Sequence, residues 1–446
     1  MSFKKFSNKD FVHLHCHSFF SQFDGLSNHS DLIMEARRMG FPALAITDHG
    51  NMMGAIQQLK ISKQTKTKKG DIIDLPPIKA IIGSEFYLSR QMDVGQYDGN
   101  KKNPLAKIRQ PDGRRGNRHL NLYAMNYEGY QNLSMLSQKS WTHGFYSDPR
   151  IDIELLSKHC KGLMCGSACL SSVINFNLLN DQYDKAKKIC ILFKEMFDNN
   201  FFLEVMYHGI PEERVIIPDI FKLGKELDIP VVATNDCHYI HKNQARSQEV
   251  LMLMSTSRCI KDPKRLRFAF DEFYLKSAQE MGKIFGSRPE SLTNSVMMAE
   301  RINTNDIEKN LFGGMRLPKF EIPKEYNGDA YEYMKKLSWE GMKKLGWDKS
   351  SKHMEAFNKE LEDIKVAQDI NGYDFSTYFL IVRDYVKYAE DNDIMVGAGR
   401  GSGFASVILR CLDITYGPDP IEFGFIWERF LGFSSRRFFI PSDLGL

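Results

Sequence analysis

The sequence has few cysteines, little net charge and no long apolar run. Its 446 residues include only 8 cysteines, and these lack the compact spacing of a disulfide framework, which predicts reduced intracellular thiols. No stretch is apolar over the roughly 20 residues that a membrane-spanning helix needs. The opening residues, "MSFKKFSNKDF", lack the apolar core of a signal peptide. We therefore expect a cytoplasmic protein with no membrane partner.

The overall charge gives no argument for a nucleic-acid partner. Lysine and arginine together number 60 and aspartate and glutamate 56, so the formal net charge is only +4. A case for nucleic acid must therefore come from local sequence. Charged residues make up 26% of the chain, as in ordinary soluble globular proteins. The length is sufficient for two to four domains with sizeable cores.

Seven β-rich segments alternate with helix-like stretches in the first half of the chain. The segments are residues 11–17, 43–50, 78–88, 119–125, 162–169, 201–209 and 229–239, and the helix-like stretches are residues 30–40, 129–140, 181–197 and 215–227. This alternation predicts an α/β fold with parallel strands and crossover helices. Seven or eight such units can close into a barrel, whose functional site lies at the C-terminal ends of the strands.

Residues able to bind metal ions occur in most of these segments. Alternation in "HLHCH" predicts that His15 and His17 share one face of a strand with His13. Imidazole nitrogens suit zinc and manganese, and a carboxylate such as Glu85 can bridge two cations. The predicted metal set is His15, His17, Asp24, His49, Glu85, His119, Cys169, Asp236 and His238. Such a three-metal cluster could supply hydroxide near neutral pH and hold a phosphate ester, so phosphoester hydrolysis is the chemistry it suits.

Each part of this set, taken alone, has a structural explanation. A lone His-x-His on a strand is more often core or surface histidine, and "TDHG" could be a turn in which Asp48 caps a helix. "NDCHY" could be a loop, and Cys169 alone is typical of a small buried apolar residue. Glu204 and His208 are left outside the predicted set as supporting or structural residues. The occurrence of ligands in successive segments is what favours a metal site.

Six of the motifs closely resemble one protein family. They are "FVHLHCHSFFSQFDG", "ITDHGNM", "GSEFYL", "HLNLYAMNYEGYQNL", "GSACLSS" and "TNDCHY". They resemble the PHP domain of the bacterial and phage C-family replicative DNA polymerases, the DNA polymerase III alpha subunits. The resemblance implies a distorted seven-stranded PHP (TIM-like) barrel with a 3′–5′ exonuclease site. It also implies three metal groups, formed by His15, His17, Glu85 and Asp236, by Glu85, His119 and Cys169, and by Asp24, His49 and His238. Glu85, Asp236 and His238 would be catalytic, and the metals would be zinc or manganese.

The second half of the chain contains a glycine-rich turn, Gly399-Arg400-Gly401-Ser402-Gly403. It lies between a short β-like stretch at 394–397 and a helical one at 404–412, and the N–H groups of such a turn and helix start can form an anion nest. Arg400 and Ser402 could add contacts to phosphate. A glycine-rich turn alone is a weak signal. Together with "YFLIV" and "DPIEFGFIWERFL" it resembles the first part of the same family's palm, which implies binding of a dNTP with magnesium.

The resemblance ends near residue 431. The family continues with a Pro-Asp-x-Asp element that binds magnesium, whereas here Asp443 alone lies near the expected place. The expected domains are a PHP barrel at 1–245, a helical connection and linker at 246–325, and a partial α+β palm at 326–446. Polymerisation would then require a second polypeptide with thumb and fingers, from a split or truncated gene, and a sliding clamp could bind through that missing part.

Two basic stretches, residues 60–70 and 100–119, give local support for DNA binding. Their lysines and arginines could attract a primer–template or a single strand through counterion release, although both could equally be solvated loops. Two other functions remain open. A free-standing phosphatase of small phosphate esters would leave residues 399–403 without a role, and a non-catalytic scaffold would use metals only to brace the barrel.

Overall fold

The computed structural model describes residues 6–67, 69–89, 117–256, 258–313, 318, 320–372, 374–399, 401–431, 433–434 and 437–438. The chain divides into two compact units, Met1–Gly313 and Gly314–Leu446. This division falls inside the segment 246–325 that the sequence assigned to a connection and linker. The functional domain boundaries given above stay predictions.

The first unit contains a curled seven-stranded sheet. Its strands are β1 (Ala43–Ile46), β2 (Lys79–Leu88), β3 (Arg118–Ala124), β4 (Arg150–Ile151), β5 (Leu163–Gly166), β6 (Phe201–Val205) and β7 (Val231–Ala233). They pair in the order β1-β2-β3-β5-β6-β7, with β4 beside β2. Six of the seven β-rich segments therefore contain a regular strand, and β4 was not expected.

The expectation of a fully parallel sheet is wrong at β3. This strand runs antiparallel to both of its neighbours, β2 and β5, while the other strand pairs are parallel. The start of β3, rather than its end, therefore lies at the edge where the parallel strands end. This direction explains why the fourth β-rich segment opens with His119, whereas the others carry their ligands near the end.

The segment at residues 11–17 closes the sheet into a ring without forming a regular strand. His13 makes a parallel bridge to Leu44 of β1, and Cys16 makes one to Cys237, which follows β7. The backbone N–H of Ala45 donates to the carbonyl of His13 at 2.9 Å, and that of His17 donates to the carbonyl of Cys237 at 2.7 Å. Hydrogen bonds thus run from β1 through this segment to the end of β7, as the predicted barrel requires.

Side-chain alternation breaks within this closing segment. Val12 and Leu14 belong to the cluster inside the barrel, whereas Phe11 and Cys16 belong to the outer core. His15 nevertheless also faces inward, since Nδ1 contacts the buried carboxylate of Glu204. The prediction that His13 shares a face with His15 and His17 is therefore wrong, because two successive residues, Leu14 and His15, point to the same side.

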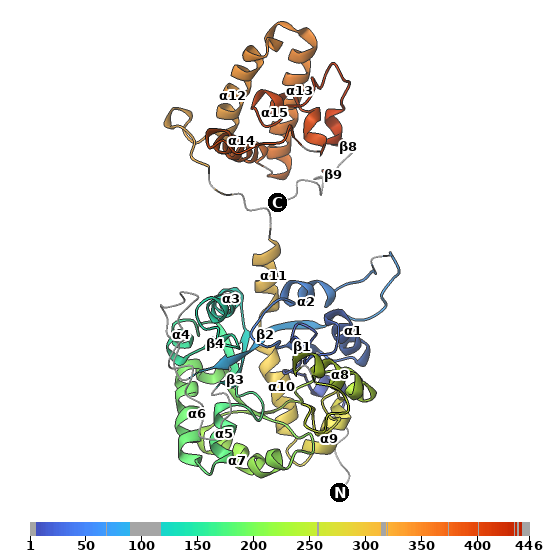
Figure 1. Cartoon of the computed structure of the whole chain (residues 1–446), viewed down its shortest axis with the longest axis vertical. Helices are drawn as coiled ribbons and strands as arrows, with labels where there is room; N and C mark the ends of the chain where they lie inside the picture. The colour runs from blue at the N-terminus through green and yellow to red at the C-terminus, as the bar shows by residue number, and fades with distance from the viewer. Residues whose placement is uncertain are drawn as a thin grey trace. The chain divides into compact units, whose positions relative to one another are not determined.

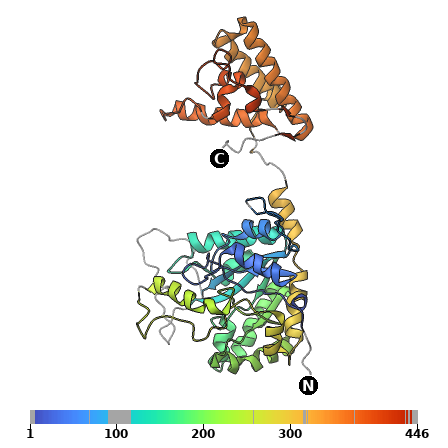
Figure 2. The same cartoon turned by 90° about the vertical axis from the view of Figure 1, so that its right-hand side faces the viewer.

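Helices cover the outside of the sheet (Figures 1 and 2). They are α1 (His29–Met39), α2 (Ala55–Ile61), α3 (Tyr127–Thr142), α4 (Ile153–Lys158), α5 (Val173–Leu179), α6 (Tyr183–Phe197) and α7 (Pro211–Leu227). The four helix-like stretches of the sequence correspond to α1, α3, α6 and α7. In α1, the Asn28 side chain accepts a hydrogen bond from the Ser30 N–H, and Gly40 ends the helix with a φ of 78°. No helix in the described part of the chain is long and apolar enough to cross a membrane.

The barrel interior is a separate core that is covered at one end. Alternate strand residues face inward, among them Ala43 and Ala45 of β1 and Phe202 of β6. They pack against Met298 and Ala299 of α10 (Glu290–Glu300). The other helices after the barrel are α8 (Ala245–Thr256), α9 (Ala278–Phe285) and α11 (Thr304–Phe312). The apolar side chains fill the end of the barrel that α10 covers, and the inward-facing polar residues lie at the opposite end.

The described part of the second unit is mainly helical. It contains α12 (Ala330–Lys344), α13 (Ser351–Asn371), α14 (Phe375–Asp391), α15 (Val407–Cys411) and a short hairpin of β8 (Phe433–Ser434) and β9 (Arg437–Phe438). The β-like stretch at 394–397 is not a strand. The N–H of Ile394 instead closes the end of α14 by donating to the carbonyl of Ala389 at 2.8 Å. Met395 is 97% exposed, so an apolar pattern here does not correspond to a buried strand.

Candidate metal centre

The nine predicted ligands come together at the polar end of the barrel. Each is supplied by a segment of the ring: His15, His17 and Asp24 by the closing segment and the loop after it, His49 by the loop after β1, Glu85 by β2, His119 by β3, Cys169 by the loop after β5, and Asp236 and His238 by the loop after β7. Their side chains adjoin one another and are described below in the three groups that the family resemblance implies. The ligand atoms of His17 also lie within 4.8 Å of those of His49 and His238, so the first and third groups are continuous. The roles of these residues as ligands stay predictions.

The first group consists of two imidazoles and two carboxylates. The Nε2 atoms of His15 and His17 lie 3.1 Å apart. Oδ1 of Asp236 lies 3.2 Å from Nε2 of His15 and 3.1 Å from Nε2 of His17. The carboxylate of Glu85 lies 3.5 Å from each of the same two nitrogens. Four side chains of the kind that bind divalent metals therefore converge on one point.

The Nδ1 atoms of His15 and His17 have hydrogen-bond partners that fix the orientation of both imidazole rings. Nδ1 of His15 lies 2.9 Å from Oε2 of Glu204, and since a carboxylate only accepts, Nδ1 carries the proton. The Ser21 hydroxyl donates to Asp48 at 2.8 Å and so accepts from Nδ1 of His17 at 2.9 Å. Both rings thus present Nε2 lone pairs to the same space, while the buried Oδ1 of Asp236 has no hydrogen-bond partner. Such a donor set fits a divalent cation.

The pKa values of the two histidines in the first group shift in opposite directions. Burial disfavours the charged form of His15, but the carboxylates of Asp236, Glu204 and Glu85 outweigh it and raise the His15 pKa well above its usual value. Burial, reinforced by the neighbouring His49 and His238, lowers the pKa of His17 to about 4. His17 therefore stays neutral near pH 7, as a metal ligand must be, while the three carboxylates around His15 favour a positive charge beside it.

The second group contains Glu85, His119 and Cys169. Oε1 of Glu85 lies 2.8 Å from Nδ1 of His119. Sγ of Cys169 lies 3.4 Å from the same nitrogen and 3.8 Å from Oε1 of Glu85. The three ligand atoms lie within 4.8 Å of one another, close enough to share one metal ion.

The third group is built around Asp24. Its Oδ2 lies 3.1 Å from Nε2 of His49 and 3.3 Å from Nε2 of His238. Nδ1 of His238 contacts the backbone carbonyl of Asp236 at 2.8 Å and must donate to it, so Nε2 is the metal-binding nitrogen of this ring in its neutral form. Nδ1 of His49 lies 2.8 Å from Oε2 of Glu85. Glu85 therefore contacts all three groups and occupies the bridging position.

Several residues that support the ligands were not in the predicted set. Glu204 accepts hydrogen bonds from Thr234 at 2.9 Å, from Asn121 at 2.8 Å and from the N–H of Ala168 at 2.8 Å, in addition to its contact with His15. Its inward-facing place in the apolar strand "FFLEV" was the available signal. His208 lies outside the centre, because Nδ1 contacts Glu213 at 2.7 Å and Nε2 contacts the Asn235 carbonyl at 3.0 Å.

In the second unit, the glycine-rich turn borders a cavity. Gly399 and Gly403 line it together with Tyr378 and Phe379, and its volume is about 430 Å³. Arg400 lies outside the described residues. The structure places Gly401 and Ser402 in a short 3₁₀ helix, residues 401–405. The role of residues 399–403 in binding nucleotide stays a prediction.

The expected use of the following helix start as an anion site is wrong. The N–H groups of Val407 and Ile408 at the start of α15 donate to the carboxylate of Glu360, at 2.7 and 2.9 Å. The Ser406 hydroxyl donates to the same carboxylate at 2.7 Å. The Glu360 carboxylate therefore already occupies the N–H groups at the start of α15.

Of the two basic stretches, the first is largely described. Within it Lys63 forms an ion pair with Glu308 at 2.5 Å. The second stretch, 100–119, lies outside the described residues up to residue 116, and Arg118 and His119 belong to β3. The DNA-binding role of both stretches stays a prediction.

Comparisons with known proteins match both units. Residues 13–208 match the model of the PHP domain, and residues 332–439 match the model described as the bacterial DNA polymerase III alpha NTPase domain. The DNA polymerase III subunit alpha of Borreliella burgdorferi is 38% identical over 421 residues, which is 94% of this chain and 34% of that protein. The corresponding subunit of Treponema pallidum is 36% identical over 424 residues, which is 94% of this chain and 33% of that protein.

The same family recurs among further relatives. The DNA polymerase III subunit alpha of Campylobacter jejuni is 35% identical over 94% of this chain and 34% of that protein. The chain thus spans about a third of the length of the curated relatives it matches. Residues 13–208 therefore match a PHP domain and residues 332–439 a DNA polymerase III alpha domain, and 94% of the chain is similar to DNA polymerase III alpha subunits.

Proposed function

We propose that the metal centre of the barrel hydrolyses the phosphodiester bond at the 3′ end of DNA, with manganese or zinc as the metal. The observation that carries this proposal is the convergence of nine ligand side chains in three groups that share Glu85. A set of this composition matches the multi-metal sites that hydrolyse phosphate esters. Similarity to DNA polymerase III alpha subunits over 94% of the chain supports DNA, rather than a small ester, as the substrate.

The exposure of the ligands indicates where the substrate would enter. The side chains of His15 and His17 are 0% exposed, whereas those of Asp24 and His119 are 27% and 20% exposed. The scissile phosphate would therefore approach the second and third groups from outside, with the first group buried beneath it. Bound metal ions would supply a hydroxide nucleophile and neutralise the phosphate charge.

The side chains themselves have separate roles in this proposal. Glu85 holds the groups at fixed separation, because one carboxylate contacts members of all three. Asp236 is 12% exposed and closes the first group on the substrate side. His238 keeps its Nε2 directed at Asp24 through its bond to the Asp236 carbonyl. We propose Glu85, Asp236 and His238 as the catalytic residues.

The protein is first freed of metal with a chelator and then supplied with manganese or zinc. The experiment measures the release of a labelled 3′ nucleotide from single-stranded DNA. Glu85→Ala should abolish release, because the three metal groups lose the carboxylate that contacts members of each. Glu213→Gln is the matched control, since Glu213 is also a buried carboxylate paired with a histidine, His208, outside the centre. It should retain the wild-type rate. DNA degradation that survives Glu85→Ala would contradict the assignment.

Two other outcomes of the same experiment point to different functions. Hydrolysis of small phosphomonoesters without release from DNA would indicate a phosphatase. Loss of thermal stability on chelation, with no hydrolysis of either substrate, would indicate that metals only brace the barrel. The binding of dNTP and magnesium by residues 399–403, and the completion of a polymerase by a second polypeptide, stay predictions that this experiment does not address.

A further inference from the structure

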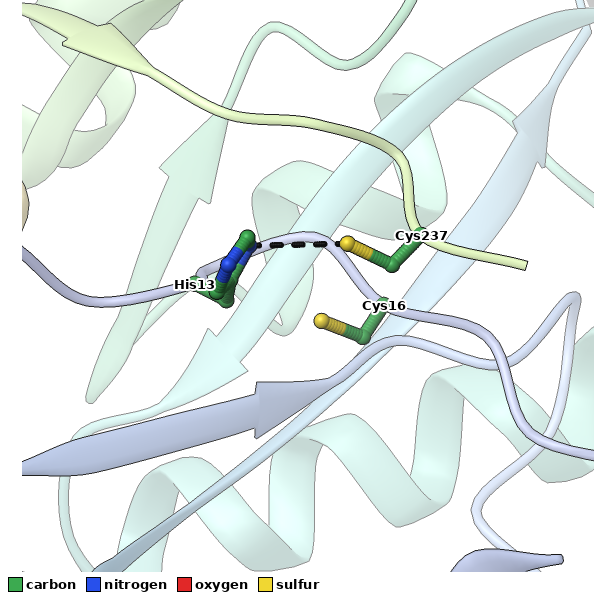
Figure 3. Close-up of side chains that lie close together, drawn as sticks. All are labelled: His13, Cys16 and Cys237. Atoms are coloured by element: carbon green, nitrogen blue, oxygen red, sulfur yellow. Dashed lines mark hydrogen bonds between the residues drawn. The ribbon is translucent and has the colours of Figure 1, made fainter. Parts of the chain in front are cut away.

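A second cluster of metal-binding side chains lies on the outer side of the barrel wall. It consists of His13, Cys16 and Cys237, whose ligand atoms all lie within 4.8 Å of one another. Figure 3 shows both sulfurs directed toward the imidazole. Nδ1 of His13 lies 3.5 Å from Sγ of Cys237. All three residues are 0–1% exposed, so the cluster is closed to solvent.

The orientation of the imidazole is fixed from its far side. Nε2 of His13 lies 2.7 Å from the backbone carbonyl of Lys276. A carbonyl only accepts hydrogen bonds, so Nε2 carries the proton and Nδ1 presents its lone pair to the two sulfurs. A ligating histidine normally has this arrangement, with its other N–H bonded to a carbonyl or a carboxylate. The ring also packs edge-on against Phe11 and Phe41, which holds its plane.

We propose that His13, Cys16 and Cys237 bind a structural zinc ion, separate from the metal centre inside the barrel. With zinc–nitrogen and zinc–sulfur bonds of about 2.0 and 2.3 Å, two ligands of a tetrahedral zinc ion lie about 3.5 Å apart. The separation of His13 and Cys237 agrees with this value. Two thiolates balance the charge of one zinc ion, so the filled site buries no net charge.

The surroundings of the cluster are compatible with this ion. The backbone carbonyl of Tyr274 lies 3.3 Å from Sγ of Cys237 and is a candidate for the fourth ligand. The nearby ammonium group of Lys276 is already compensated, because it lies 3.2 Å from Oδ1 of Asn235 and 3.1 Å from the carboxylate of Glu272. A closed site with no open coordination position is typical of structural zinc.

The position of the site gives the zinc a function in the fold. Cys16 lies between His15 and His17 in the sequence, and Cys237 lies between Asp236 and His238. The same two backbone segments are joined by the bridge that closes the barrel. A zinc ion on the outer side would therefore lock this closure and position four of the nine predicted ligands on the inner side.

Cadmium-113 NMR of the full chain tests this site without removing any residue, because the chemical shift of cadmium reports the number of thiolate ligands. Two kinds of thiolate-bound cadmium are expected: one with two thiolates, from the outer cluster, and one with a single thiolate, from Cys169. Absence of the two-thiolate resonance in the wild-type protein would overturn the proposal. So would a Cys16–Cys237 disulfide found by mass spectrometry of non-reduced peptides.

Substitutions then assign the resonances. Cys16→Ser and Cys237→Ser should each remove the two-thiolate signal and lower the bound zinc by one equivalent per chain. Cys169→Ser should leave that signal unchanged and remove only the single-thiolate one. Cys190→Ser is the matched control, since Cys190 is a buried cysteine of α6 outside both sites. A two-thiolate signal that persists in Cys16→Ser would place the site elsewhere and contradict the proposal.

Discussion

Oε2 of Glu204 accepts a hydrogen bond from Nδ1 of His15 at 2.9 Å, and this bond directs Nε2 of His15 toward His17 and Asp236. Glu204 is itself held by Asn121, Thr234 and the N–H of Ala168. The orientation of a metal-binding histidine is therefore built into the wall of the barrel before any ion binds. Its contribution to metal affinity can be measured.

Glu204→Gln should weaken metal binding by about 10–100-fold, the usual effect of removing a partner that orients a metal ligand. The amide preserves the shape of the side chain but no longer fixes the His15 tautomer with a negative charge. Competition with a chromophoric chelator measures the affinity. Glu213→Gln, which changes a buried carboxylate away from the centre, should leave the affinity unchanged. Equal affinities for wild type and Glu204→Gln would show that Glu204 has only a packing role.

The buried Glu360 should make the second unit less stable as the pH rises. Burial, opposed by its hydrogen bonds from Ile408, Ser406 and Val407, raises its pKa from the usual 4.5 to about 7. Between pH 4.5 and pH 7, Glu360 keeps its proton in the folded state but loses it in the unfolded state. The contribution of Glu360 to the free energy of unfolding is therefore greatest below pH 4.5. It falls by about 3 kcal/mol as the pH rises to 7.

Glu360→Gln should remove this dependence, because the amide does not titrate. The measurement is the urea midpoint at several pH values, followed by tryptophan fluorescence, since Trp339, Trp347 and Trp427 all lie in the second unit. The difference between wild type and variant isolates Glu360 from other titrating groups. A wild-type stability that rises relative to the variant over this window would mean that the three hydrogen bonds outweigh burial and keep the carboxylate charged.

Met298→Ala should open a cavity at the covered end of the barrel and lower the free energy of unfolding by about 2–5 kcal/mol. Met298 is 0% exposed and packs in the interior cluster with strand residues. The control is Met254→Ala in α8, where the methionine is 65% exposed and the expected change is within about 0.5 kcal/mol. Urea unfolding of the full chain measures both. Equal effects would show that α10 does not close a packed core.

The sequence predicted the barrel, and the convergence of the candidate ligands at one end of it, because both depend on regular patterns. Strand–helix alternation located six of the seven strands of the sheet, all except β4, and the motifs placed polar residues at a common edge. The face of His13 could not be predicted, since it depends on a break in alternation between Leu14 and His15 that only the closure of the ring imposes. The direction of β3 depends on pairing with distant strands, which periodicity does not report.

The sequence could not decide between a supporting and a structural role for Glu204 for a related reason. The role of Glu204 depends on contacts with Asn121 and Thr234, which lie far from it in the sequence. The helix start at Val407 looked free for an anion because Glu360, which occupies it, lies 47 residues earlier. For Glu204 and for the helix start at Val407, the sequence shows that polar groups are present. Which groups they bond to depends on tertiary packing.

The most direct test of the metal centre is anomalous diffraction from crystals of the full chain supplied with manganese or zinc. The account predicts anomalous peaks within the three ligand groups that share Glu85, including one bounded by His15, His17 and Asp236. A peak in the outer cluster of His13, Cys16 and Cys237 would be a separate result. Crystals that contain the added metal elsewhere, but show no peak between His15, His17 and Asp236, would contradict the account.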